Sequence, residues 1–168
     1  MSNYIKQVTS SLENIIHELS TNPSLFLRNP TTDFTRNRKI DFKTFIGITM
    51  NSGGGTMNKE LLDFFDFNLN TPTVSAYTQQ RAKVLPEAFE YLFHTFTRDN
   101  IPDVNDYSGY RLIACDGSNL SIATNPDDAE TVRIHNQYGD ISNHLHLNAF
   151  YDVINRVYLD VIIQTQSE

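Results

Sequence analysis

The first part of the chain carries the hydrophobic spacing of an amphipathic helix. Apolar residues recur at steps of three and four from Ile5 to Leu19, which predicts about five helical turns ending near Pro23. Asp41 is the expected N-cap of a second helix, and the Ser-Gly-Gly-Gly run at 52–55 ends that helix. A helical start to the chain is therefore predicted.

Three further helices are predicted before residue 100. The first is expected over 59–65. The second is expected over 74–84, with Thr71 as the N-cap and Pro72 at the first helical position. Pro86 opens the third. The pattern predicts a helical bundle over residues 1–100.

Beyond this bundle the pattern changes to that of a linker followed by a strand. Residues 101–109 hold Pro, Asn, Asp and Ser at the density of a linker. A short apolar strand is expected over 110–115, ending at a turn formed by Asp116, Gly117 and Ser118. Residues 119–143 are polar without a clear period and are expected to form an extended loop.

Two alternating segments close the chain. Residues 144–152 and 157–163 each place apolar side chains on one face, and the tight connection between them predicts a β-hairpin. The fold class expected from the whole pattern is α+β, with domains at 1–100 and 110–168.

Charge divides the chain in the same place. The formal net charge is −7, yet residues 1–100 hold ten Lys and Arg against ten Asp and Glu, and all the excess acid lies after residue 100. Nucleic-acid binding relies on Lys and Arg, so the first half is the candidate for it. The single Cys115 excludes a disulfide framework, and it is expected to be a small buried hydrophobic residue on the face opposite Asp116.

The clearest candidate for chemistry is Asp116, a carboxylate that follows an apolar strand. Such a group can bind a divalent metal, although an Asp-Gly pair is also typical of a plain turn. One carboxylate cannot form a two-metal site. His144 and His146 share a strand face but lack a third ligand at compatible spacing, and the acids at 127–130 are typical of a solvated loop.

Four segments of the sequence resemble a known family. They are LIACDGSNLSI at 112–122, NPDD at 125–128, LHLNAFYD at 145–152 and YLDVIIQ at 158–164. These segments resemble the DDE transposases of bacterial insertion sequences, of the insertion-sequence-four type. Segments of the helical half, such as KELLDFF at 59–65, are similar to that family as well.

The resemblance implies an RNase H-like catalytic domain whose first three strands are antiparallel neighbours. It places Asp116 as the first catalytic and metal-binding Asp, with Mg²⁺ or Mn²⁺ as the cofactor of the complete enzyme. The second Asp and the Glu of that family fall beyond Glu168, so the chain is expected to be an N-terminal portion that is inactive alone. Residues 157–163 are then expected to leave an apolar face exposed.

Double-stranded DNA, in particular transposon terminal repeats, is the partner expected for the helical half. The helices at 59–65 and 74–84 have the proportions of a helix-turn-helix, although helix pairs are common in any bundle. Candidate DNA contacts are Arg36, Arg38, Lys39, Lys43, Ser75, Tyr77, Gln80, Arg81 and Lys83.

Two alternative functions remain beside the transposase. One is a DNA-binding or inhibitory module derived from a truncated transposase, and the other is a small interaction protein without a DNA role. A homodimer on DNA and a cytoplasmic, nucleoid-associated location in a bacterium are expected. No membrane partner is expected.

Overall fold

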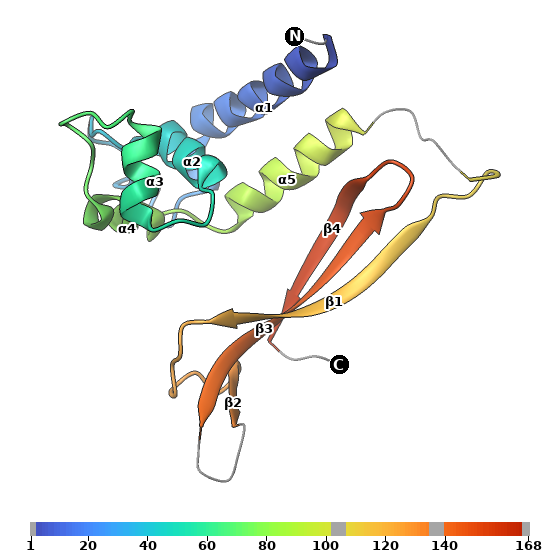
Figure 1. The fold of residues 1–168 in the computed structure, drawn as a ribbon. Helices are drawn as coiled ribbons and strands as arrows, with labels where there is room; N and C mark the ends of the chain where they lie inside the picture. Colours follow the sequence, from blue (N-terminus) through green and yellow to red (C-terminus); the bar gives the residue numbers. More distant parts are fainter. Residues whose placement is uncertain (1–2, 102–106, 135–139, 166–168) are drawn as a thin grey trace. The chain divides into compact units, whose positions relative to one another are not determined.

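The computed structural model describes residues 3–101, 107–134 and 140–165. Within these residues the fold is α+β, with five α-helices followed by an antiparallel sheet (Figure 1). The chain divides into two compact units, residues 1–100 and 101–168. The division falls where the predicted linker 101–109 begins, and residues 102–106 of that linker lie outside the described residues.

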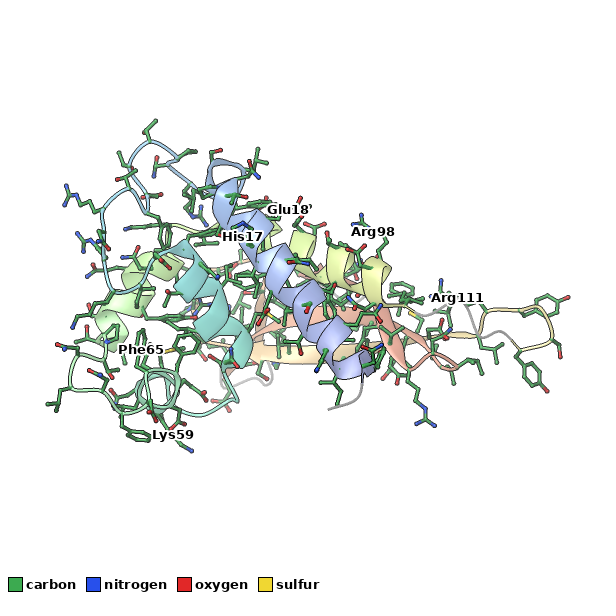
Figure 2. The ribbon with its side chains drawn as sticks, turned by 90° about the horizontal axis from the view of Figure 1, so that it is seen from above. His17, Glu18, Lys59, Phe65, Arg98 and Arg111 are labelled. Carbon is green, nitrogen blue, oxygen red and sulfur yellow. The ribbon has the colours of Figure 1, made fainter. Side chains whose placement is uncertain are left out.

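The long helices of the first unit pack side by side. α1 (Asn3–Thr21) contacts both α5 (Glu87–Asn100) and α2 (Phe42–Asn51). The Tyr91 hydroxyl of α5 donates a 2.8 Å hydrogen bond to Glu18 Oε1 of α1, and Figure 2 labels Glu18 beside His17 on that helix. These contacts fix the frame that carries the shorter helices.

The hydrophobic core lies within this first unit. Its most deeply buried apolar side chains include Leu19, Phe45, Ile46, Ile48 and Leu61. Burying an apolar side chain of this size stabilises a fold by about 1.5–3 kcal/mol. The helical periodicity of the sequence is therefore confirmed by the residues that become buried.

Side-chain caps set where the short helices begin. Asp41 caps α2 as predicted, because its carboxylate accepts a hydrogen bond from the Thr44 N–H. Thr56 caps α3 (Met57–Phe64). The N-cap predicted for α4 (Val74–Arg81) is wrong, because Thr73, and not Thr71, accepts from the Ala76 N–H. The Thr71 hydroxyl instead donates to the Asn68 carbonyl in the preceding turn, so Pro72 precedes the cap.

α4 also ends earlier than the expected 84. The Arg28 N–H donates to the Lys83 carbonyl and the Leu85 N–H donates to the Phe26 carbonyl, each over 2.9 Å. These hydrogen bonds between two segments of the chain hold residues 83–85 in an extended pairing with residues 26–28. Tertiary hydrogen bonding therefore overrides local helical preference at this end.

The second unit is a sheet built around one central strand. β3 (Ile141–Asp152) pairs antiparallel with β1 (Ile113–Ile122), with β4 (Val157–Gln164) and with the short β2 (Val132–Ile134). Asn143 pairs with both Ile122 and Val132, so β2 lies on the side of β3 away from β1. The predicted hairpin is confirmed, since β3 and β4 are joined by residues 153–156.

Two expectations about the start of the sheet are wrong. Asp116, Gly117 and Ser118 do not turn the chain, because β1 continues through them to Ile122 with β3 as its partner. Residues 119–143 are likewise not a single loop, since they include the end of β1, all of β2 and the start of β3. Gly117 permits close contact with the neighbouring strand: a Cβ there would lie 2.8 Å from His146 Nε2.

The side chains buried in the described part of the sheet unit are polar. They are Thr131, Asn143 and Asp152. The apolar face expected to be exposed on residues 157–163 is exposed only in part: Ile163 is 60% exposed, whereas Val157, Leu159 and Val161 are half-buried. Cys115 lies on the face opposite Asp116 but is exposed, so its predicted burial is wrong. Within the described residues, no helix has the length and apolarity needed to cross a membrane.

Candidate functional site

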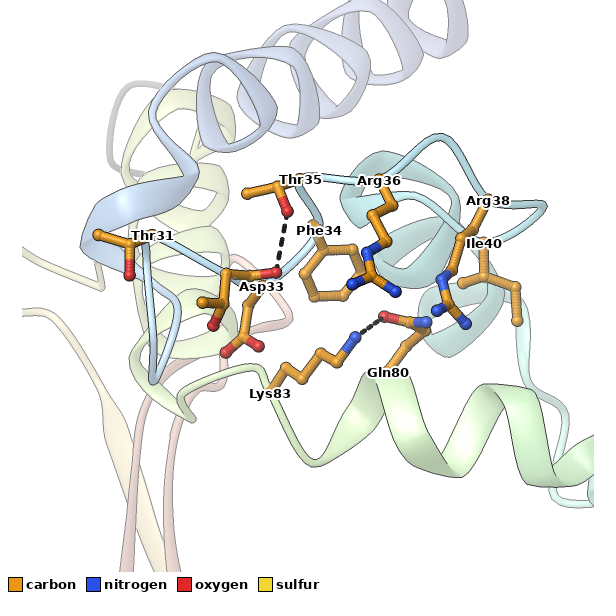
Figure 3. A pocket seen from close by; sticks show the side chains of 10 residues that line it. Thr31, Asp33, Phe34, Thr35, Arg36, Arg38, Ile40, Gln80 and Lys83 are labelled. Atoms are coloured by element: carbon orange, nitrogen blue, oxygen red, sulfur yellow. Dashed lines mark hydrogen bonds between the residues drawn. The ribbon is translucent and has the colours of Figure 1, made fainter.

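The loop over residues 31–40 and the end of α4 enclose a pocket of about 320 Å³ (Figure 3). Residues 31–40 come from the basic segment of the sequence, and Gln80 and Lys83 come from the helix predicted to contact DNA. The full lining is Thr31, Thr32, Asp33, Phe34, Thr35, Arg36, Arg38, Ile40, Gln80 and Lys83. Two segments expected to bind DNA therefore meet at one place.

Backbone and core contacts hold the loop of the pocket in shape. The Asp33 carboxylate accepts a 3.0 Å hydrogen bond from the Asn29 N–H, which closes the turn that enters the loop. Phe34 has a positive φ of 54°, and its ring packs edge-on against Phe42 with centroids 5.5 Å apart. Ile40 is buried at the other end. The loop is therefore anchored on both sides of its two arginines.

Three cations surround the pocket. Lys83 Nζ donates to Gln80 Oε1 over 2.9 Å and lies 5.4 Å from the Phe34 ring centroid, a cation–π distance. The Arg36 and Arg38 side chains are exposed, and Figure 3 shows their guanidinium groups extending over the pocket towards Gln80. Among the described residues neither arginine forms an ion pair with a carboxylate.

Gln80 supplies a polar group at the base of the pocket. Its side chain is only 3% exposed, and its Oε1 accepts from Lys83. Its Nε2 donor faces the Arg38 guanidinium group in Figure 3, and no acceptor for it is found within residues 3–101, 107–134 and 140–165. Donors from four side chains thus line one pocket, and the Lys83 ammonium and the Gln80 amide are joined by a hydrogen bond.

The other predicted DNA contacts lie outside this pocket. Lys39 Nζ donates to the Asn70 carbonyl over 2.8 Å, Lys43 is exposed on the first turn of α2, and Ser75 is exposed near the start of α4. Arg81 is exposed and lines a second cavity, of about 770 Å³, together with Arg28.

Tyr77 belongs to the core and not to an exposed recognition face. Its side chain is 4% exposed, and its ring stacks on Phe45 with centroids 5.4 Å apart. Its hydroxyl lies 3.0 Å from Thr49 Oγ1. The connection between α3 and α4, residues 65–73, is also longer than the three or four residues of a helix-turn-helix. The expected helix-turn-helix proportions are therefore wrong.

Asp116 lies in the middle of an exposed sheet face. Its Cα partner on β3 is Ala149, and residues directly opposite each other in a sheet share a face. The Asp116 side chain is exposed. On the same face Ser118 follows it along β1 and pairs with Leu147 of β3, so the residue opposite the carboxylate is the small Ala149 and not a second acid.

Among the described residues, Asp116 is not joined by the further ligands that a metal centre needs. Within the described residues, no group of three or more His, Cys, Asp or Glu side chains is placed to hold an ion. His144 and His146 share the opposite face, as expected, where His146 Nδ1 lies 3.1 Å from Asn119 Oδ1. The Asp128 carboxylate accepts from the Thr131 hydroxyl within its own loop.

Two polar residues that organise the sheet unit were missed in the sequence. The buried Asn143 side chain bonds both the N–H and the carbonyl of Asn125, and it donates to Thr131 Oγ1. Asp152 is fully buried and forms a 2.7 Å ion pair with Arg111. A polar residue inside an alternating strand is the only local signal for either.

A glycine-rich segment of the helical unit binds an internal carboxylate. Glu60 Oε2 accepts from the Gly53 N–H over 3.0 Å, and Oε1 accepts from the Gly55 N–H over 2.6 Å. These two backbone hydrogen bonds lower the pKa of Glu60. The neighbouring Lys59 extends outward from α3 (Figure 2). The N–H groups of Gly53 and Gly55 therefore bind the Glu60 carboxylate and not an external phosphate.

Comparison with protein-family models, with curated proteins and with solved structures finds no match to the chain. The resemblance to insertion-sequence transposases therefore rests only on the segments of sequence quoted for it, at 59–65, 112–122, 125–128, 145–152 and 158–164.

Proposed function

We propose that the protein binds double-stranded DNA through its helical unit. The observation that carries this proposal is the pocket at which Arg36, Arg38 and Lys83 converge from two separate segments. Cations without carboxylate partners are the groups that bind DNA phosphates and release their counterions. The exposed Lys43 and Arg81 of the same unit add positive charge for a longer contact.

The resemblance extends this proposal to a role in transposition. The DNA would then be the terminal repeats of an insertion sequence, and the complete enzyme would cut and join them with Mg²⁺ or Mn²⁺. The order β1, β3, β4 of antiparallel neighbours, with Asp116 on the first strand, supports an RNase H-like beginning. Asp116 would be one metal ligand of that enzyme.

A DNA-binding or inhibitory module is the second candidate. It is favoured by the contrast between a basic pocket with converging donors and an Asp116 that has no acidic neighbours among the described residues. Incubating the full chain with transposon-end duplexes and Mg²⁺ or Mn²⁺ distinguishes the transposase from the DNA-binding module. Strand cleavage that Asp116→Asn abolishes supports the transposase, whereas binding without cleavage supports the module.

DNA binding is tested by gel retardation of a duplex whose two ends are closed by loops, at increasing salt. We expect Arg36→Gln/Arg38→Gln to weaken binding and to reduce the slope of log K against log salt by about two, at roughly 0.9 per phosphate contact. The control Lys6→Gln/Lys59→Gln removes the same charge from exposed positions outside the pocket.

Two results would contradict the proposal. One is the absence of retardation of the closed duplex even at low salt. The other is an equal loss of affinity and slope in the control double variant, which would assign the effect to net charge and not to the pocket.

A further inference from the structure

The charge of the pocket exceeds what one DNA phosphodiester requires. Its lining holds Arg36, Arg38 and Lys83 against the single carboxylate of Asp33, a formal net charge of +2. In Figure 3 the Asp33 carboxylate lies at the end of the pocket away from Arg38, and it is already bonded to the Asn29 N–H. A phosphodiester carries one negative charge, whereas a phosphate monoester carries about 1.5 to 2 at neutral pH.

The arrangement of donors around the pocket favours a group at the end of a chain. Gln80 is 3% exposed, and its amide lies in the lining beside the guanidinium groups of Arg36 and Arg38 (Figure 3). An internal phosphodiester is flanked by sugars on both sides and presents two free oxygens at the surface of the duplex. A terminal phosphate has three free oxygens and one attachment, so it can accept hydrogen bonds from donors on several sides of the pocket.

We infer that this pocket binds a terminal phosphate monoester, such as the 5′-phosphate at a DNA end. The inference rests on the proposed DNA-binding function and specifies which part of the DNA the pocket contacts. The guanidinium groups of Arg36 and Arg38 and the ammonium of Lys83 bind the phosphate oxygens, and the Gln80 amide donates a further hydrogen bond to one of them. The hydroxyls of Thr31, Thr32 and Thr35 complete the polar lining.

The test compares three duplexes of one sequence with the full chain. One has both ends closed by loops, one has an open end with a 5′-hydroxyl, and one has the same open end with a 5′-phosphate. We expect the 5′-phosphorylated duplex to bind about tenfold more tightly than the 5′-hydroxyl form, as charge-assisted hydrogen bonds predict. Arg38→Gln should remove most of this preference, and so should Gln80→Met.

The control Lys6→Gln/Lys59→Gln should keep the preference while lowering affinity for all three duplexes alike. Since Gln80 is buried, its variant is checked for native helical content by circular dichroism. The exposed Arg38→Gln provides the same test without disturbing the core. Calorimetric titration with a nucleoside 5′-monophosphate and with inorganic phosphate shows whether the phosphate alone suffices, and dimethyl phosphate serves as the diester control.

The outcomes separate this inference from the proposed function. Equal affinity for the 5′-phosphate and 5′-hydroxyl ends, with the closed duplex still bound, overturns the inference and leaves DNA binding in place. Binding of the monophosphate without binding of any duplex overturns DNA binding and supports the pocket as a monoester site. Binding of neither overturns both.

Discussion

Asp152 shows how one buried carboxylate can organise a hairpin. It accepts hydrogen bonds from the backbone N–H and the side-chain amide of Asn155, over 2.8 and 2.9 Å, and from Arg111 Nε over 2.7 Å. The Asn155 backbone bond, followed by its side-chain bond and by Arg111, lowers the pKa of Asp152 from 3.8 to about 2. Arg111 precedes β1, so the carboxylate ties the start of the sheet to its last turn.

We expect acid to weaken the sheet through this residue. The pKa of Asp152 is lower in the folded state than its ordinary value of 3.8, so the ionised carboxylate stabilises the fold above about pH 4. That contribution is lost as the pH falls through about 2. The measurement is thermal unfolding of the β unit, followed by amide exchange or circular dichroism, across this pH range.

Asp152→Asn should lower the melting temperature by several degrees at neutral pH and should flatten the acid dependence. The exposed Asp127 provides the control, because Asp127→Asn should leave the acid profile unchanged. An Asp152→Asn variant with the wild-type profile would show that another group governs the acid response.

At the scale of elements, α4 is the helix whose position matters most for the pocket. It is short, it carries Gln80, and its first turn is fixed by the Thr73 hydroxyl. Caps of this kind satisfy N–H groups that have no partner within the helix. A loosened cap would therefore disturb both the stability of the unit and the base of the pocket.

Thr73→Ala should destabilise the helical unit by about 1 kcal/mol, the usual value of a lost N-cap. Thr73→Ser keeps the accepting oxygen and should restore most of the loss. Urea unfolding of the full chain, followed at helical peptides by hydrogen exchange, measures the difference. Equal stabilities for the Ala and Ser variants would mean that the hydrogen bond at the cap contributes nothing.

Hydrophobic periodicity predicted α1, α2 and α5 because apolar residues recur at helical spacing in each, and Leu19, Phe45 and Leu92 of these helices are buried in the core. It failed at β1, where Asp116-Gly117-Ser118 has the composition of a turn. The reason for Gly117 lies on another strand, at His146, and no local pattern contains that contact. Strand existence was predictable at the closing hairpin because both strands alternate clearly and are adjacent in sequence.

The candidate site was predictable only in its parts. Arg36 and Arg38 stood out as a local excess of basic residues, and Lys83 stood out on its helix. That they share one pocket depends on the pairing of residues 26–28 with residues 83–85, a tertiary contact. Tyr77 was expected on the exposed face, yet the same helix turns it towards Phe45.

At the scale of the whole molecule, the two units differ in what stabilises them. The core of buried apolar side chains lies in residues 1–100. The side chains buried in the described residues of the sheet unit are polar, and Leu120, Tyr158 and Ile163 are each at least half exposed. Apolar burial is the main favourable term in folding, so the two units should differ in stability.

We expect the chain to unfold in two steps. In hydrogen exchange at increasing denaturant, peptides from β1 and β4 should lose protection while peptides from α2 remain protected. Loss of protection in both units at one denaturant concentration would indicate a single cooperative unit instead. In that case, a variant that stabilises only the helical unit would raise the denaturant midpoints of both units together.

The central position of β3 has a consequence for synthesis of the chain. β1 ends at residue 122, but its pairing partner is complete only at residue 152. At about 5–20 residues per second, translation leaves β1 without its neighbour for roughly 2–6 seconds. The hairpin of β3 and β4 closes through a short local turn, so it can form first and then receive β1. The strand that carries Asp116 is thus the first of the sheet to leave the ribosome, and it stays unpaired until β3 has been made.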